Sequence, residues 1–233
     1  PANAIEVAPG VFSLGNAVVN GEQVEGYAFV HYKNKDGLAK RDSNALAGSL
    51  CYGFLSKGAK WKSVEPWIVN TANSRGLDSA FVLTNLGADI SKWETAAGKN
   101  ILGSGSLTSN VLVADTISPD NKNEVYFADV ASSGAIAVTI VWGRFSGPIS
   151  QRYLTEWDQV YDDVDFDWSA SGEIGKMDFE NIATHELGHS VGMGDLYTTT
   201  CLEQTMYGYS TEGETKKRTL EAGDITGVKK LYA

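Results

Sequence analysis

The sequence predicts a mixed fold of helices and strands, of the α/β or α+β class, and we assign it to α+β. A helical pattern is followed by several short β-like runs, and two more helical patterns close the chain. With 233 residues, 42% of them hydrophobic and 21% charged, the chain can bury a large core. One large domain, or a domain with a small appendage, is therefore expected, and a disordered or collagen-like chain is excluded.

The first part of the chain differs in pattern from the rest. Val24–Gly37 alternates enough apolar and aromatic residues to predict a strand, and the following residues 38–49 are small and polar. We expect a boundary near Ser56. It would separate an N-terminal segment, residues 1–57, from the main domain, residues 58–233.

The first helix is predicted over Leu77–Gly98. Its apolar residues recur at a spacing near 3.6, Asp78 stands near its start and Gly98 near its end. A short strand is predicted before it, over Glu65–Asn70.

Four strands are predicted in the middle of the chain. Ser109–Asp115, Glu124–Val130 and Ala135–Phe145 are short β-like runs, and the last is apolar enough to be an interior strand. Arg152–Asp165 is a fourth run with many acidic residues, and turn-forming residues such as Ser118–Asn123 separate the strands.

Two helices are predicted near the C-terminus. Met177–Gly192 has Asp178 as an N-cap candidate. Arg218–Ala233 carries cations near its end and places four apolar residues along one face, namely Leu220, Ile225, Val228 and Leu231.

Charge and hydropathy narrow the class of partner. A net charge of −10 and a pI near 4.8 oppose binding to nucleic acid, so none is expected. No apolar run approaches the roughly 20 residues that span a bilayer. The sequence begins at Pro1 with no signal-like segment, and we expect a soluble, processed protein without a membrane span.

The chemistry is concentrated in the HELGH sequence of His185 to His189. Residues four apart lie one turn apart on the same helix face, so the two imidazoles can converge on one metal ion. Glu186, rotated by about 100°, can reach a water bound to that ion. This spacing suits zinc.

A catalytic zinc usually takes three protein ligands, so one more is needed. Gly192 can adopt a left-handed conformation, end the helix and turn the chain back, so that Asp195 approaches the same ion from another direction. We choose Asp195 and set His31 aside because it is remote in sequence. Later carboxylates are alternatives: Glu203, Glu212 and Glu214.

The segment His185–Asp195, HELGHSVGMGD, resembles the long zinc motif HExGHxxGxxH/D of the metzincin metallopeptidases, in the form whose last ligand is Asp, as in snapalysin-like enzymes. Three further segments resemble the matrixin branch: Gly58–Trp61 before the first strand and helix, Thr205–Ser210 at the place of the Met-turn, and Leu220–Tyr232 as the last helix. The resemblance covers roughly residues 58 to 233.

The resemblance implies a metzincin-like catalytic domain with a twisted mixed β-sheet, an active-site helix and a C-terminal helix. It implies one catalytic zinc held by His185, His189 and Asp195, Glu186 as general base, and Met206 as a hydrophobic floor below the metal. The expected protein is an extracellular, monomeric endopeptidase that cleaves proteins or peptides. Its substrate should lie extended along an edge strand.

The chain departs from the matrixin pattern in three places. Asp195 stands where matrixins normally have a third His, and no His remains for their second zinc. Gly208, Tyr209 and Ser210 replace the Pro-x-Tyr wall, so the shape of that pocket is not carried over, and Tyr209 is not assigned to the metal.

Two alternative functions remain open. One is a zinc peptidase whose third ligand is a Glu on a later helix. The other is a zinc-containing binding module without turnover. The role of Glu186 argues against the second, because metal binding alone has no use for that carboxylate.

Cys51 and Cys201 are the two cysteines, and they are too few for a disulfide framework. Matrixin propeptides use a cysteine to block the zinc, and Cys51 stands ten residues before Trp61, but its surroundings lack the propeptide motif. We favour a Cys51–Cys201 disulfide over a latent zymogen held by Cys51. The acidic run Asp158–Asp167 is a candidate for Ca²⁺, or else a strand with one wet face.

Overall fold

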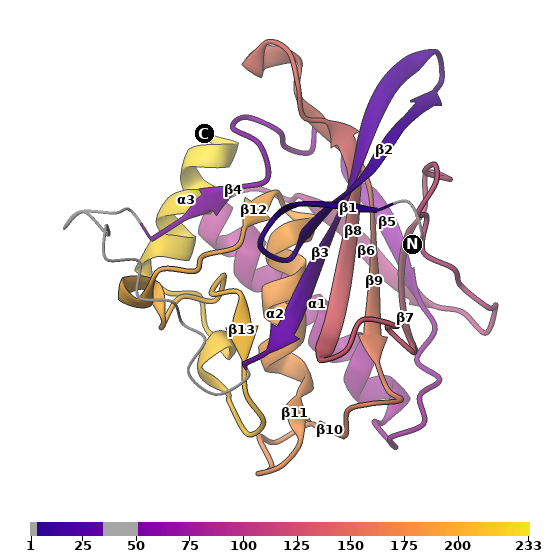
Figure 1. The fold of residues 1–233 in the computed structure, drawn as a ribbon, viewed down its shortest axis with the longest axis vertical. Helices are drawn as coiled ribbons and strands as arrows, with labels where there is room; N and C mark the ends of the chain where they lie inside the picture. Colours follow the sequence, from indigo (N-terminus) through magenta and orange to yellow (C-terminus); the bar gives the residue numbers. More distant parts are fainter. Residues whose placement is uncertain (1–3, 35–50) are drawn as a thin grey trace.

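The computed structural model describes residues 4–34 and 51–233, and it confirms an α+β fold with a mixed sheet and three helices (Figure 1). The main sheet runs in the order β1 (Ile5–Ala8), β2 (Val11–Val19), β3 (Glu22–Lys33), β8 (Ala135–Arg144), β9 (Tyr153–Asp162), β7 (Asn123–Ala128), β5 (Glu65–Val69), β6 (Leu102–Leu107), and β13 (Tyr209–Ser210) also pairs with β3. Two short pairs lie outside it, β10 (Trp168–Ser169) with β11 (Met177–Asp178), and β4 (Gly53–Phe54) with β12 (Met193–Gly194).

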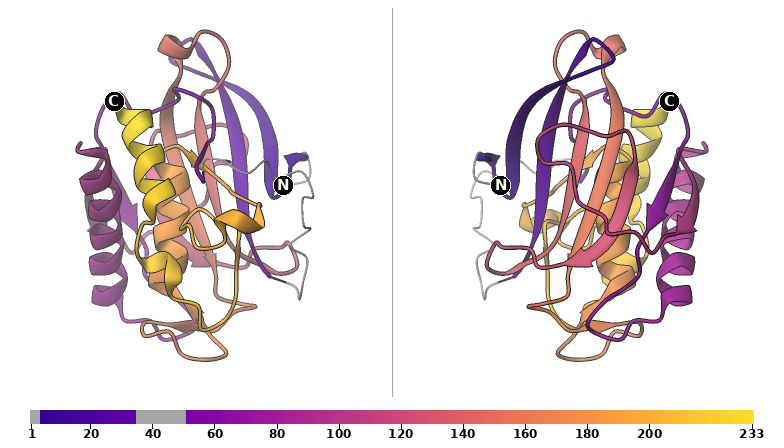
Figure 2. Two further views of the ribbon diagram at one scale, coloured as in Figure 1. Left: turned by 90° about the vertical axis from the view of Figure 1, so that its left-hand side faces the viewer. Right: turned by 90° about the vertical axis from the view of Figure 1, so that its right-hand side faces the viewer.

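The helices are α1 (Ser79–Ala97), α2 (Phe179–Ser190) and α3 (Ala222–Tyr232), and all three lie on one side of the sheet (Figure 2). The indole of Trp93 on α1 donates to the carbonyl of Thr184 on α2 at 2.9 Å. The core between helices and sheet is built from large buried side chains, among them Trp93, Trp157, Tyr161, Phe179 and Leu187. Among the described residues, no helix is long and apolar enough to cross a bilayer.

The first helix confirms its predicted signals. Asp78 caps the N-terminus by accepting the amide hydrogen of Phe81 at 2.9 Å. Gly98 ends the helix in a left-handed conformation, with φ at 69°.

One predicted strand is wrong and another was missed. Ser109–Asp115 is not a strand. The strand is β6, just before it, which pairs in parallel with β5. Its sequence LGSGSL conceals a β-strand because Gly105 lies under the ring of Trp67, where a Cβ atom would clash.

The acidic strand β9 also differs from its prediction. Apart from Tyr153 and Thr155, which are intermediate, its residues are buried, so it has no wet face. It is covered by neighbours on both sides because it lies between β8 and β7 in the middle of the sheet.

The N-terminal strands belong to the same sheet as the main domain. β2 and β3 form an antiparallel hairpin whose turn places Asn20 and Gly21 at positive φ. β3 then pairs antiparallel with β8. The boundary near Ser56 stays a prediction, and residues 38–49 lie outside the described part of the chain.

The active-site helix begins later than predicted, at Phe179, and Asp178 caps it by accepting the amide hydrogen of Asn181 at 3.0 Å. The guanidinium of Arg218 donates to both Asp178 oxygens, at 2.8 and 2.6 Å. This ion pair holds Arg218 in a 3₁₀ turn, Lys216–Arg218. The last helix therefore starts at Ala222 instead of Arg218.

The two cysteines form the expected disulfide. The Cys51 and Cys201 sulfur atoms are 2.04 Å apart, and the bond links residues 150 positions apart in sequence. Cys51 is therefore not available as a thiolate on zinc, and the zymogen held by Cys51 is not supported.

Replacing Asp178 should destabilise the fold more than replacing Asp78, although both residues cap helices. We expect Asp78→Ala to lower the free energy of unfolding by about 1 kcal/mol, the usual value of an N-cap. Asp178→Ala should lower it by about 2–4 kcal/mol, because the buried carboxylate also holds Arg218. Urea unfolding of both variants measures this difference, and equal losses would contradict the role given to the ion pair.

Candidate active site

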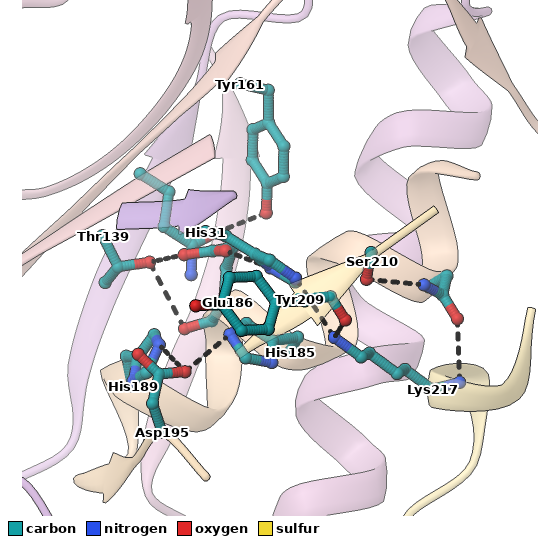
Figure 3. A network of polar contacts seen from close by, with 12 residues as sticks. His31, Thr139, Tyr161, His185, Glu186, His189, Asp195, Tyr209, Ser210 and Lys217 are labelled. Carbon is teal, nitrogen blue, oxygen red and sulfur yellow. Dashed lines mark hydrogen bonds and ion pairs between the residues drawn. The ribbon is translucent and has the colours of Figure 1, made fainter. Parts of the chain in front are cut away.

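The HELGH residues and Asp195 meet at one point beside α2 (Figure 3). Nε2 of His185 and Nε2 of His189 lie 3.3 and 3.5 Å from Oδ1 of Asp195. The two imidazoles come from successive turns of α2, and Asp195 comes from the chain that returns after the helix. One donor atom from each of the three residues lies within 4.8 Å of the others.

Gly192 makes this return possible. Its φ is 103°, a conformation that L side chains rarely adopt. A Cβ atom there would also lie 2.9 Å from Leu231 and 3.0 Å from the carbonyl of Ala59. The hydroxyl of Tyr197 lies 3.2 Å from Oδ2 of Asp195 and fixes the orientation of that carboxylate.

The hydrogen bonds of both imidazoles prepare them to bind metal. Nδ1 of His185 lies 2.7 Å from the carbonyl of Thr205, and Nδ1 of His189 lies 3.0 Å from the carbonyl of Met193. A carbonyl only accepts, so each Nδ1 carries the proton and each Nε2 keeps its lone pair. Nε2 of His185 and Oδ1 of Asp195 are buried without a hydrogen-bond partner. A nitrogen and oxygen donor set of this kind suits zinc.

The charge states of these residues suit a cation as well. Burial lowers the pKa of His185 to about 4, and the nearby Lys217 acts in the same direction. Burial alone would raise the pKa of Asp195, but the neighbouring imidazoles outweigh it and hold that pKa well below its usual range. Neutral imidazole and ionised carboxylate are the forms that bind metals.

Glu186 is fixed beside the three donors. Its Oε2 accepts a hydrogen bond from the hydroxyl of Thr139 at 2.5 Å, and its Oε1 lies 3.0 Å from Nδ1 of His31. Burial raises the pKa of Glu186 to about 7. A carboxyl group with a pKa near neutrality can both take and return a proton.

Two residues of the site were missed in the sequence, and setting His31 aside was wrong. The His31 ring lies 3.9 Å from the His185 ring, centroid to centroid, and its Nε2 lies 3.1 Å from Nζ of Lys217. Burial lowers the pKa of His31 well below its usual value, so His31 is neutral, donating to Glu186 and accepting from Lys217. Tyr27, Phe29 and His31 alternate along β3, which signals one inward face, but not what that face meets.

Lys217 is fully buried, which is rare for a lysine. Its ammonium group donates to the carbonyls of Tyr207 and Tyr209 as well as to His31. Burial lowers its pKa to about 8. The three acceptors hold a positive charge close to Glu186 and Asp195.

Met206 lies below the two imidazoles. A Cβ atom at Gly188 would clash with the Met206 sulfur, so the helix and this side chain are in close contact between His185 and His189. The backbone amides of Thr205 and Met206 donate to the buried Asp224.

The alternative third ligands are engaged elsewhere. Glu212 pairs with Lys33 at 2.7 Å, and the Glu203 and Glu214 carboxylates lie 4.0 and 3.7 Å from Lys216. The acidic run Asp158–Asp167 does not gather into one site, because Asp162 and Asp163 accept hydrogen bonds from nearby backbone amides.

Comparison with known proteins agrees with this geometry. Residues 148–233 match the Peptidase_M10 family, described as matrixin, and this span contains all the residues of the HELGH motif, Asp195 and Met206. The chain is 38% identical over 97 residues to metalloendoproteinase 1 of Glycine max, and 39% identical over 69 residues to metalloendoproteinase 1-MMP of Arabidopsis thaliana. These matches cover 38% and 30% of this chain, and 30% and 18% of those proteins, so the chain spans less than a third of the length of either relative.

Removing the third donor should remove the metal. We expect Asp195→Ala, purified with added zinc and then dialysed, to lose most of its zinc, because two imidazoles alone leave the site incomplete. The matched control is Glu203→Ala, which removes an exposed rival carboxylate and should keep its zinc. Atomic absorption on both proteins measures the difference, and full zinc content in Asp195→Ala would contradict the assignment.

Proposed function

We propose that this chain is a zinc-dependent endopeptidase of the matrixin type. His185, His189 and Asp195 would hold the metal, and Glu186 would act as the general base. The observation that carries the proposal is the convergence of three buried donors on one point, with two of them lacking any other partner. The match to the matrixin family over the same residues supports it.

The chemistry of the site follows from its own residues. A bound zinc would polarise the scissile carbonyl and lower the pKa of its water to about 7. Glu186 would accept the proton of the attacking water on Oε1 and return it to the leaving amine. Thr139 would keep the other oxygen of Glu186 in place through its hydrogen bond. Met206, packed against Gly188, would keep α2 at a fixed height under the metal.

Substrate and location are part of the same proposal. Both relatives named above are metalloendoproteinases, and we extend protein or peptide substrates to this chain on that basis. The disulfide supports an extracellular location, because such bonds persist in oxidising compartments.

The competing functions receive less support. A peptidase with a later Glu as third ligand would need one of the rival carboxylates, and these pair with lysines instead. A zinc module without turnover would have no need for a buried glutamate beside the metal. Burying that carboxylate is costly, and only a function or a strong set of partners would retain it.

Glu186→Gln tests the catalytic role separately from metal binding. The substitution keeps the shape of the side chain but removes the base, so zinc should remain while casein cleavage falls by roughly 10²-fold or more. Glu203→Gln is the matched control and should change neither quantity. A chelator should abolish cleavage in the parent chain, and added zinc should restore it. Unchanged cleavage in Glu186→Gln would support the non-catalytic alternative.

A further inference from the structure

A second cluster of buried carboxylates lies on the outer face of the sheet. Along β9, Gln159 and Tyr161 face the helices, where Gln159 donates to Ser190 of α2. Glu156 and Asp158 therefore face the opposite side, because side chains alternate along a strand. There they meet Asp115, and one oxygen from each of the three lies within 4.8 Å of the others.

The hydrogen bonds of this cluster leave it one partner short. Asp158 accepts the backbone amide hydrogens of Asp115 at 2.8 Å and Glu124 at 3.2 Å. Oε2 of Glu156 accepts from the amide of Asn121, but Oε1 of Glu156 is buried without a partner. Glu156 and Asp158 are 0% and 1% exposed. Among the described residues, no lysine or arginine forms an ion pair with any of the three carboxylates.

Three carboxylates in one buried place repel one another strongly unless a cation or protons neutralise them. Without a cation, burial and the neighbouring acids raise the pKa of Glu156 to about 9. A donor set made only of oxygens suits a hard divalent ion, and Ca²⁺ accepts mixed carboxylate and carbonyl ligands in flexible geometry.

We propose that Asp115, Glu156 and Asp158 form a Ca²⁺ site. The ion would join β9 to the segment that precedes β7 and would hold that segment over the outer face of the sheet. The site differs from the acidic run Asp158–Asp167 as a whole, since it takes only Asp158 from it. It is also separate from the candidate zinc site, on the other face of the sheet.

Glu156→Gln tests this proposal. We expect Ca²⁺ to raise the melting temperature of the zinc-loaded parent chain by roughly 5 °C or more at saturation. Glu156→Gln removes a buried charge, so it should fold as stably as the calcium-free parent but gain nothing from Ca²⁺. Asp167→Asn, an exposed member of the acidic run, is the matched control and should keep the full response.

Calorimetry with Ca²⁺ alone gives a readout that does not depend on stability. Heat of binding in the parent chain and in Asp167→Asn, but not in Glu156→Gln, supports the site. Absence of binding in the parent chain at millimolar Ca²⁺, or equal binding in Glu156→Gln, would overturn it.

A different observation concerns β3, which covers the candidate active site. The ring of Phe29 stacks on His189 with centroids 4.7 Å apart, and His31 lies against His185 and Glu186. His185 and Glu186 are 0% exposed as a result. A polypeptide cannot reach these residues while β3 is in place.

The position of β3 is one that a peptide substrate could use. Extended peptides commonly bind by adding a strand to a sheet edge. β3 runs antiparallel to β8, with His31 opposite Ala137, and parallel to β13, with Tyr32 opposite Tyr209. Without β3, β8 would be the edge strand beside α2.

We infer that β3 occupies the substrate track and that the described conformation is a latent form. This inference rests on the proposed function. The covalent link at Cys51 lies after β3, so sheet pairing and side-chain contacts hold β3 over the site. Among these contacts, Lys217 clamps His31 and two carbonyls of the β13 region. A substrate binds only when β3 separates from β8 and β13.

Cross-linking β3 to its neighbour tests whether it must move. Val30 and Val138 are opposite one another in β3 and β8, so the pair Val30→Cys and Val138→Cys can form a disulfide. The matched control, Val138→Cys with Val160→Cys, ties β8 to β9 instead. We expect the first lock to reduce casein cleavage and the affinity for a peptidyl hydroxamate by about tenfold or more, and the control to change neither. Equal values in the two locked proteins would overturn the inference.

His31→Ala separates an inhibitory role from a catalytic one. Loss of the clamp should free β3 more often and raise casein cleavage and hydroxamate affinity several-fold, at unchanged zinc content. Reduced cleavage with unchanged hydroxamate affinity would mean that His31 assists catalysis while β3 stays in place, and would overturn the inference. If His31→Ala binds zinc and hydroxamate but cleaves no better than its Glu186→Gln derivative, the proposed function fails while the blocked track stands.

Discussion

The active-site geometry depends on two hydrogen bonds that fix the imidazoles of His185 and His189. Each Nδ1 is held by a backbone carbonyl from outside α2, one from Thr205 and one from Met193. These bonds choose the tautomer and the ring orientation, and so they aim both Nε2 atoms at Asp195. They also tie the helix to the two segments that follow it. The segment after α2 and the segment around Met206 must therefore be in place before the donors converge.

The sequence predicts what is local and misses what is paired over a distance. The spacing of His185 and His189 fixes their common face through helix geometry alone, and Gly192 signals the turn that brings Asp195 back. His31 could not be placed in this way. It reaches Glu186 only because β3 pairs with β8, more than a hundred residues later in the sequence, and no local pattern specifies that partner. The same reason explains why Lys217 was not recognised.

The strand β9 links the two sites through its alternation. Its odd-numbered residues pack against α2 and help to hold the helix, as Gln159 does through Ser190. Its even-numbered residues carry the outer carboxylates. An acidic sequence on a central strand was interpreted as a wet face, yet both faces are covered. The charges are retained in the interior because each face has a distinct polar partner, backbone amides and the proposed ion on one side, and the active-site helix on the other.

The contacts of β3 combine two tendencies that oppose each other. Burying Phe29 and His31 against the imidazoles stabilises the covered state through stacking and through the removal of apolar surface from water. Lys217 opposes this stabilisation in part, because a fully buried ammonium loses its hydration and depends on three acceptors to compensate. One of these acceptors, His31, is on β3, and the other two are on the segment that pairs with it. Separation of β3 would remove one acceptor and let water reach the ammonium group, so the loss is partly offset. A covering strand held by such a contact can be stable in the free chain and still yield to a competing peptide that forms the same backbone pairing.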